Sequence, residues 1–419
     1  ITTRLVGSEM CIRDSIYTSI RLIMKKIFIT FLLFFAFSVS TWAQKDEFNP
    51  INTGVNSLGI APDSRGGGMG DVGAATDPDN NSQFWNPAKY PFTIGRAGVS
   101  ISYTPWLRKL VSDIDLAYLA GYYRIGDYQA ISGSLRYFSL GEVPVGQGSD
   151  GTGGYNISPY EMAVDVAYSR MLSERFSAAV ALRYIYSDLA YKQDEEVSPG
   201  SAFAADIAFY YTNYIMLAQR ECMLSFGLNL SNIGTKISYD SGAHSQFLPT
   251  NFRLGGSLLA PIDDYNTIAF SLDLNKLMVP TRPTKEQYQA ATGAEDTSGY
   301  NDWLDAEGYN DISPIKGIFK SFSDAPGGFK EELQEIQWSL GVEYTYHNQF
   351  SVRGGYHYEH ENKGNRKYFS FGAGFKMSVF SLDAAYLIST AQSNPLDQTL
   401  RFTLGFDLDG IRDLFGRRR

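Results

Sequence analysis

Residues 399–408 read Thr-Leu-Arg-Phe-Thr-Leu-Gly-Phe-Asp-Leu, and this stretch decides the fold class. Its apolar residues, Leu400, Phe402, Leu404, Phe406 and Leu408, share one parity, and the polar or small residues share the other. Successive side chains of a β-strand point to opposite faces of a sheet. The alternation therefore predicts a strand with one wholly apolar face and one polar face.

The same alternation recurs along most of the chain after residue 94. We expect fourteen strands of about ten residues each, at 95–104, 112–124, 128–139, 160–170, 175–187, 201–212, 222–231, 250–260, 266–275, 337–346, 349–359, 367–377, 379–389 and 398–408. A tilted strand of this length crosses a bilayer, and an even number of strands is typical of bacterial outer-membrane barrels.

The connections between these segments alternate in length. Brief ones at 126–127, 171–174, 261–265, 347–348 and 378 alternate with long ones at 140–159, 188–200, 232–249, 276–336 and 390–397. Outer-membrane barrels have short periplasmic turns and long outer loops. A soluble β-sandwich has no reason to sort its loops in this way and would need a second sheet to cover its aromatic faces. The sequence therefore predicts an all-β membrane protein, a 14-stranded antiparallel outer-membrane barrel spanning residues 94–409.

Composition excludes several other classes of protein. The 419 residues carry a net charge of -9, with 44% hydrophobic and 14% aromatic residues but only 2 Cys and 4 His. So few Cys and His rule out a disulfide scaffold and a multi-Cys metal site. The acidic balance argues against nucleic-acid binding. No apolar run of about 18 residues is present, which excludes a polytopic helical membrane protein.

The first 43 residues have the features of a processed leader. Met24-Lys25-Lys26 precedes the apolar run 27–37 and a small-residue site that ends at Ala43. This pattern predicts a secretory signal peptide at 24–43. A buried helix is the alternative, but such a helix would not begin with Met-Lys-Lys. Residues 1–23 resemble translated sequencing-adaptor readthrough, so we expect a non-native extension there.

Residues 44–93 form a glycine-rich stretch before the first strand. Its two motifs contain Arg65, Gly66, Gly67, Gly68, Met69, Gly70, Asp71, Trp85, Asn86, Pro87 and Ala88. Glycine permits close backbone approach, which suits an irregular segment packed against a barrel wall. We expect this segment to plug the lumen from the periplasmic side. The glycine run lacks the Gly-Lys-Ser/Thr ending of a phosphate-binding loop.

Charged residues of both signs fall on the parity predicted to face the lumen. They are Asp115, Arg136, Asp165, Arg183, Asp206, Asp273, Glu343, Arg353, Asp383 and Arg401. Because an unpaired buried charge is costly, we expect ion pairs that cross the lumen and help to hold the barrel closed. A conduction or selectivity path is the functional alternative.

Several motifs carry a family resemblance. The signal peptide, residues 64–71, Trp85-Asn86-Pro87-Ala88-Lys89, residues 102–107 and the following barrel together resemble the PorV family. That family is a group of outer-membrane shuttle proteins of the type IX secretion system, within the wider FadL-like barrels. The resemblance covers 44–408. The basic tail at 410–419 departs from it, because many outer-membrane barrels end on an aromatic residue.

The resemblance implies a binding role in the outer membrane of a Gram-negative, Bacteroidota-like bacterium. Such proteins bind the C-terminal signal domain of exported cargo, associate with the large translocon barrel and deliver cargo to a sortase-containing attachment complex. Two alternatives remain open. A FadL-like transporter of hydrophobic molecules should have an apolar pocket between plug and wall, and a passive porin should have an open polar lumen.

The longest connection is rich in apolar residues for a solvated loop. Within 276–336 it holds Trp303, Tyr309, Ile315, Phe319, Phe322 and Phe329. Exposed apolar groups of this kind mark interaction sites, so we expect the loop to dock cargo or the translocon. Folding over the barrel mouth as a lid is the alternative.

Catalytic and metal-binding chemistry is not expected. His357 and His360 lie three residues apart, on opposite faces of a strand, so they cannot share an ion without a break in the strand. Residues 77–81 resemble the start of a Ca²⁺ loop but lack its Gly and Glu. No nucleophile elbow is present. We expect a non-enzymatic protein without a cofactor.

Overall fold

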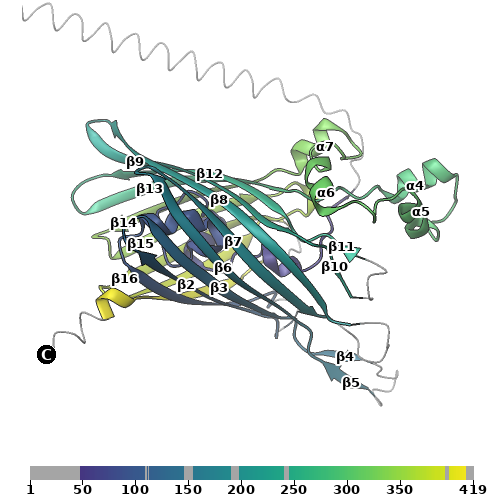
Figure 1. Cartoon of the computed structure of the whole chain (residues 1–419), viewed down its shortest axis with the longest axis horizontal. Coiled ribbons are helices and arrows are strands. Elements are labelled where there is room, and N and C mark those ends of the chain that lie inside the picture. The colour runs from purple at the N-terminus through teal and green to yellow at the C-terminus, as the bar shows by residue number, and fades with distance from the viewer. Residues whose placement is uncertain are drawn as a thin grey trace, which may run out of the picture. The chain divides into compact units, whose positions relative to one another are not determined.

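The computed structural model describes residues 48–108, 111, 113–145, 154–189, 198–239, 245–391 and 396–411. Within them, fourteen antiparallel strands form one closed barrel, in the order β1-β18-β17-β16-β15-β14-β13-β12-β9-β8-β7-β6-β3-β2 (Figure 1). The expected extension at 1–23, the signal peptide at 24–43 and all but the first two residues of the tail at 410–419 lie outside the described residues. The prediction of a 14-stranded antiparallel barrel is confirmed.

Each predicted segment coincides with one barrel strand. The strands are β1 (Ala97–Pro105), β2 (Asp115–Ile125), β3 (Gln129–Ser139), β6 (Tyr160–Ser173), β7 (Phe176–Asp188), β8 (Gly200–Leu217), β9 (Arg220–Gly234), β12 (Asn251–Pro261), β13 (Asn266–Leu277), β14 (Gln337–Tyr346), β15 (Phe350–Tyr358), β16 (Lys367–Lys376), β17 (Phe380–Ser389) and β18 (Leu400–Asp407). The largest difference is between β8 and β9, where pairing continues to Leu217 and Arg220 and leaves a two-residue turn instead of a longer connection.

The first and last strands close the barrel. Val99 of β1 is paired with Phe406 of β18 on one side and with Gly121 of β2 on the other. No barrel strand in the described part of the chain is left with an unpaired edge. Closure of this kind satisfies the backbone groups that lipid cannot hydrogen-bond.

The side chains alternate between an apolar exterior and a polar interior. On β7, the outward-facing Val180 and Leu182 are 53% and 68% exposed. Arg183, on the inward face of the same strand, is only 8% exposed. Phe203 on β8 and Val352 on β15 are likewise exposed at mid-strand. An exterior of large apolar side chains is what a barrel presents to lipid. The chain is therefore an outer-membrane barrel.

The two ends of the barrel differ. At one end, the turn end, strands are joined by short connections at 126–128, 174–175, 218–219, 262–265, 347–349 and 377–379. The other, the loop end, carries the small sheets β4 (Val143–Val145) with β5 (Tyr155–Ile157) and β10 (Ile237–Ser238) with β11 (Ser245–Gln246), and the helices α4 (Lys285–Thr292), α5 (Tyr300–Ala306), α6 (Pro314–Lys320) and α7 (Phe329–Gln334). Short periplasmic turns and long outer loops place the loop end outside the cell.

The N-terminal segment, residues 48–93, contains four short helices that lie against strands from several sides of the barrel (Figure 1). They are η1 (Asn56–Gly59), α2 (Ser64–Gly67), α3 (Ser82–Trp85) and η2 (Pro87–Phe92). Among the described residues, no helix has the length and apolar character needed to span a membrane.

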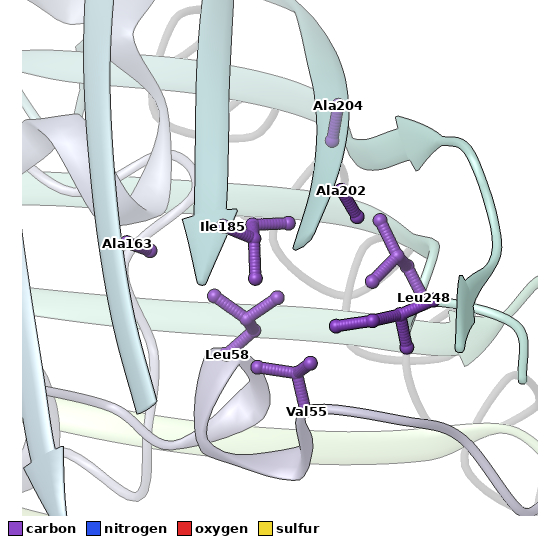
Figure 2. Packing of buried hydrophobic residues seen from close by; sticks show 8 residues of the cluster. Val55, Leu58, Ala163, Ile185, Ala202, Ala204 and Leu248 are labelled. Carbon is purple, nitrogen blue, oxygen red and sulfur yellow. The ribbon is translucent and has the colours of Figure 1, made fainter. Parts of the chain in front are cut away.

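A buried apolar cluster joins the N-terminal segment to the barrel wall. Val55 and Leu58 pack against Ile185 of β7 and against Ala202 and Ala204 of β8 (Figure 2). Ile237 and Leu248, from the connection between β9 and β12, complete the cluster with Ala163. Apolar contact therefore holds the segment near the loop end, where the lumen is otherwise polar.

A lysine on the barrel exterior should be costly in proportion to its depth in the membrane. We expect Leu182→Lys, at mid-strand, to lower the free energy of unfolding by about 2–4 kcal/mol, and Leu172→Lys, near the turn end, by about 1 kcal/mol or less. Reversible unfolding in lipid vesicles, followed by heat-modifiable electrophoretic mobility, measures both. Equal costs at the two positions would contradict a lipid-facing exterior.

Candidate functional site

The first motif folds around Asp63 and Trp85. Asp63 caps α2 by accepting from the Gly66 amide at 2.9 Å, and it also accepts from Trp85 Nε1 at 2.6 Å. The indole lies so close to the backbone that a Cβ on Gly66 or Gly73 would come within 2.3 or 2.2 Å of it. The glycines are therefore required by the tryptophan of the second motif.

Glycines on the strands make similar room for the N-terminal segment. An added Cβ on Gly355 of β15 would lie 2.0 Å from the carbonyl carbon of Met69, and one on Gly227 of β9 would lie 1.9 Å from the carbonyl oxygen of Ala74. The backbone of the segment thus rests directly on the backbone of the wall.

The second motif is fixed by Asn86. Its Nδ2 donates to the carbonyls of Ala74 and Phe209, at 3.0 and 2.9 Å, and its Oδ1 accepts from the Ala88 amide. Ala88 then packs against Ala179 and Ala208. Pro87 follows Asn86 at the start of η2, a position that suits its fixed φ. The motif ties the segment to β7 and β8.

Seven of the predicted lumen charges form ion pairs on the inward face. Arg183 pairs with Asp206 at 2.8 Å and with Asp165 at 3.1 Å. Arg353 pairs with Glu343 at 2.5 Å and with Asp383 at 2.6 Å. Arg401 pairs at 2.6 Å with Asp71 of the N-terminal segment.

Arg65 joins the motif to the same charges. It donates to Glu343 at 2.8 Å and to Asp79 at 2.9 Å, so Glu343 lies between Arg65 and Arg353. From the sequence, the first glycine-rich motif and the lumen charges were predicted as separate sets. Because Arg65 and Asp71 of the motif form ion pairs with Glu343 and Arg401 of the wall, the two sets form one network.

The other three predicted charges have no ion pair with a lumen charge among the described residues, and only Asp115 lies off the inward face. The prediction that Asp115 faces the lumen is wrong. Leu116 and Tyr118 occupy the inward parity of β2, so Asp115 lies on the outward parity, 3.5 Å from Arg108. Asp273 accepts from the amides of Gly73 and Ala74, both at 2.9 Å. Arg136 donates to the carbonyls of Ser57 and Ile60. Asp273 and Arg136 therefore bind backbone groups of the N-terminal segment. A pattern of charged residues cannot predict such partners.

A cavity of about 300 Å³ lies between the N-terminal segment and the wall. Its lining includes Arg136, Asp165, Arg183, Asn232, Arg253, Gln337, Glu359, Lys363 and Arg366. Apolar residues, among them Ile51, Leu58, Phe84 and Leu277, share this lining, so the cavity is mixed in character and is not the wholly apolar pocket expected for a FadL-like transporter.

Buried ion pairs hold the largest connection to the barrel. Lys276 of β13 donates to Glu335 at 2.5 Å and to Glu332 at 3.0 Å. Lys363, after β15, donates to Glu335 at 3.1 Å and to Glu331 at 2.5 Å. These contacts fix α7 to two different parts of the wall. These ion pairs were not predicted from the sequence, although three acidic residues lie within 331–335.

The six apolar residues predicted to bind a partner separate into two groups. Trp303 packs against Tyr288 and Tyr300, and Tyr309 donates to the Pro280 carbonyl at 2.9 Å. By contrast, Ile315, Phe319, Phe322 and Phe329 are 65%, 74%, 52% and 78% exposed. We call these four residues the loop surface. The first group stabilises the connection, and only the second is available to a partner.

The two histidines considered for a metal site are separate. His357 on β15 contacts Ser339 Oγ at 2.9 Å and stacks on Tyr368, whereas His360 accepts from the Asn362 amide. In the part of the chain that the structure describes, no three His, Cys, Asp or Glu side chains are grouped to hold a metal ion.

Alanine at Gly355 should separate the segment from the wall. We expect Gly355→Ala to lower the free energy of unfolding by about 1–3 kcal/mol, because its Cβ would overlap the backbone at Met69. Gly354→Ala is the matched control, since an added Cβ there meets no atom within 4 Å. Thermal unfolding in detergent and protease sensitivity of residues 48–93 report the effect. Identical behaviour of the two variants would contradict it.

Asp63 should make stability depend on pH. Burial, and then the nearby Asp79, raises the pKa of Asp63 to about 6. The folded state therefore holds this proton more tightly than the unfolded state, and stability should fall by on the order of 2–3 kcal/mol as pH rises from about 4 to 6. Asp63→Asn should remove this component. The measurement is the difference between wild-type and variant unfolding free energies across that range, and a constant difference would refute the assignment.

The family model described as "Type IX secretion system protein PorV" matches residues 43–284, more than half of the chain. No curated protein matches this chain. The Pseudomonas putida toluene transporter TodX is 9% identical, with 86% of this chain and 99% of that chain covered and a TM-score of 0.47. A Pseudomonas aeruginosa FadL homologue is 12% identical, with 86% and 99% covered and a TM-score of 0.42. The match to the family model shows that this chain belongs to the PorV family of type IX secretion system proteins.

Proposed function

We propose that the loop surface binds the C-terminal signal domain of exported cargo at the large translocon barrel, and that the protein then delivers this cargo to the sortase-containing attachment complex. The observation that carries the proposal is the exposure of Ile315, Phe319, Phe322 and Phe329 at the loop end. Lipid does not cover side chains beyond the membrane, and clustered apolar side chains in water mark a site for a protein partner.

The support beneath this surface suits a binding role. Glu335 is 2% exposed and receives hydrogen bonds from Lys276, Lys363 and Thr281. Because α7 is held in place by these contacts, less conformational freedom would be lost when a partner binds. A surface that is ordered before binding is expected of a protein that must accept cargo repeatedly.

The alternatives have less support. A lid over the barrel mouth would bury its apolar side chains, whereas Phe319 and Phe329 are each more than 70% exposed. Transport of hydrophobic molecules needs an apolar pocket, and the cavity beside the N-terminal segment has five cationic side chains among its apolar ones. A passive porin needs an open lumen, whereas residues 48–93 hydrogen-bond to many of the strands. Closure of the lumen to solutes by this segment is part of the proposal.

Polar substitutions in the loop surface should weaken cargo binding. We expect Phe319→Ser with Phe329→Ser to weaken binding of a purified C-terminal signal domain by at least about tenfold, because aromatic anchors dominate such interfaces. Surface plasmon resonance with the detergent-solubilised barrel measures the affinity.

The matched control replaces exposed residues at the opposite end of the barrel. Tyr214 and Met216 are 63% and 70% exposed near the turn end, so Tyr214→Ser with Met216→Ser should leave the affinity unchanged. Heat-modifiable mobility verifies that both double variants are folded. Normal cargo affinity in the loop-surface variant, or an equal loss in the control, would contradict the proposal.

A further inference from the structure

The cavity beside the N-terminal segment contains an imbalance of charge. Five cationic side chains line it, Arg136, Arg183, Arg253, Lys363 and Arg366, against three carboxylates, Asp71, Asp165 and Glu359. Three of the five cations have carboxylate partners within ion-pair distance: Arg183 pairs with Asp165 and Asp206, Lys363 with Glu331 and Glu335, and Arg366 with Glu359. The remaining two, Arg136 and Arg253, have no ion pair with any described residue.

The partners of these two arginines are neutral. Arg136 Nη1 donates to the carbonyls of Ser57 and Ile60 at 2.5 and 2.9 Å, and its buried Nη2 has no hydrogen-bond partner among the described residues. Arg253 Nε donates to Asn275 Oδ1 at 2.8 Å. Asp273, on the strand beside Arg253, uses its Oδ2 to accept from two backbone amides. Among the described residues, neither arginine has a carboxylate oxygen at ion-pair distance, although Asp273 Oδ1 is buried without a hydrogen-bond partner there.

Both guanidinium groups are held by aromatic rings. The central carbon of Arg136 lies 5.0 Å from the ring centroid of Phe84, and that of Arg253 lies 5.1 Å from the same centroid. Arg253 is also 4.6 Å from the Trp85 ring. Contact with an aromatic face fixes a guanidinium and leaves its edge available for hydrogen bonds. The two arginines are thus positioned around one aromatic residue that borders the cavity.

We propose that this cavity binds a small hydrophilic oxyanion, a carboxylate or phosphate group. The partly exposed Arg253 would contact it directly, and Arg136, which is 4% exposed, would contribute its charge from the wall. A planar guanidinium matches the geometry of both groups. Asn232, Asn251 and Gln337 also line the cavity and supply amide donors. Apolar side chains, among them Leu58, Phe84 and Leu277, share the lining, so the two arginines rather than the cavity as a whole would select the charged group. The site is distinct from the loop surface and does not depend on cargo binding.

Titration of the full-length barrel in uncharged detergent tests the proposal. The probes are succinate, inorganic phosphate and decanoate, and binding is measured by isothermal titration calorimetry. We expect saturable binding of succinate or phosphate, weakened at least about tenfold in Arg253→Met and measurably in Arg136→Met. Arg220→Met is the control, because Arg220 is exposed at the turn end and should leave the affinity unchanged.

The outcomes separate the possibilities. Succinate binding without phosphate binding identifies a carboxylate ligand, and the reverse identifies a phosphate. Arg253→Lys should retain part of the affinity, which distinguishes loss of a charge from loss of the fold. The proposal is overturned if neither oxyanion binds, if Arg253→Met binds as tightly as wild type, or if only decanoate binds.

Discussion

The absence of hydrogen-bonding partners in lipid is the constraint on which this structure depends. Every backbone amide and carbonyl in the membrane must be paired within the sheet, and a sheet achieves this only by closing on itself. The pairing of β1 with β18 provides that closure. Once the cylinder is closed, the pleat fixes the remaining chemistry: one parity of each strand faces lipid, and the other faces an enclosed space.

That enclosed space creates a second requirement, because polar groups inside it need partners as well. The N-terminal segment supplies many of them. Asp71 pairs with Arg401, Arg65 pairs with Glu343, and the amides of Gly73 and Ala74 donate to Asp273. The segment in turn buries Trp85, Met69 and Tyr90. Wall and segment therefore stabilise each other, and the glycines at their contact permit the close approach that short hydrogen bonds need.

The loop end carries the exposed aromatic residues at which we propose that large partners bind. A rigid barrel with variable loops is a common arrangement for binding, because the scaffold fixes the position of segments that do not need to span the membrane. Here Lys276 and Lys363 extend the scaffold outward by holding Glu332 and Glu335 near α7. The exposed Phe329 of α7 is thereby kept on a stable support.

The alternation of apolar and polar residues determined the number, direction and approximate limits of the strands, because the period of two follows from local backbone geometry. The same signal did not determine which way Asp115 faces, because the apolar residues Leu116 and Tyr118 occupy the inward parity of β2 and hydrophobicity there does not mark the lipid face. Nor could it reveal that Arg136 and Asp273 bind backbone groups, or that Trp303 and Tyr309 are packed while Phe319 and Phe329 are exposed. Those outcomes depend on contacts between residues far apart in the chain, which only the folded barrel brings together.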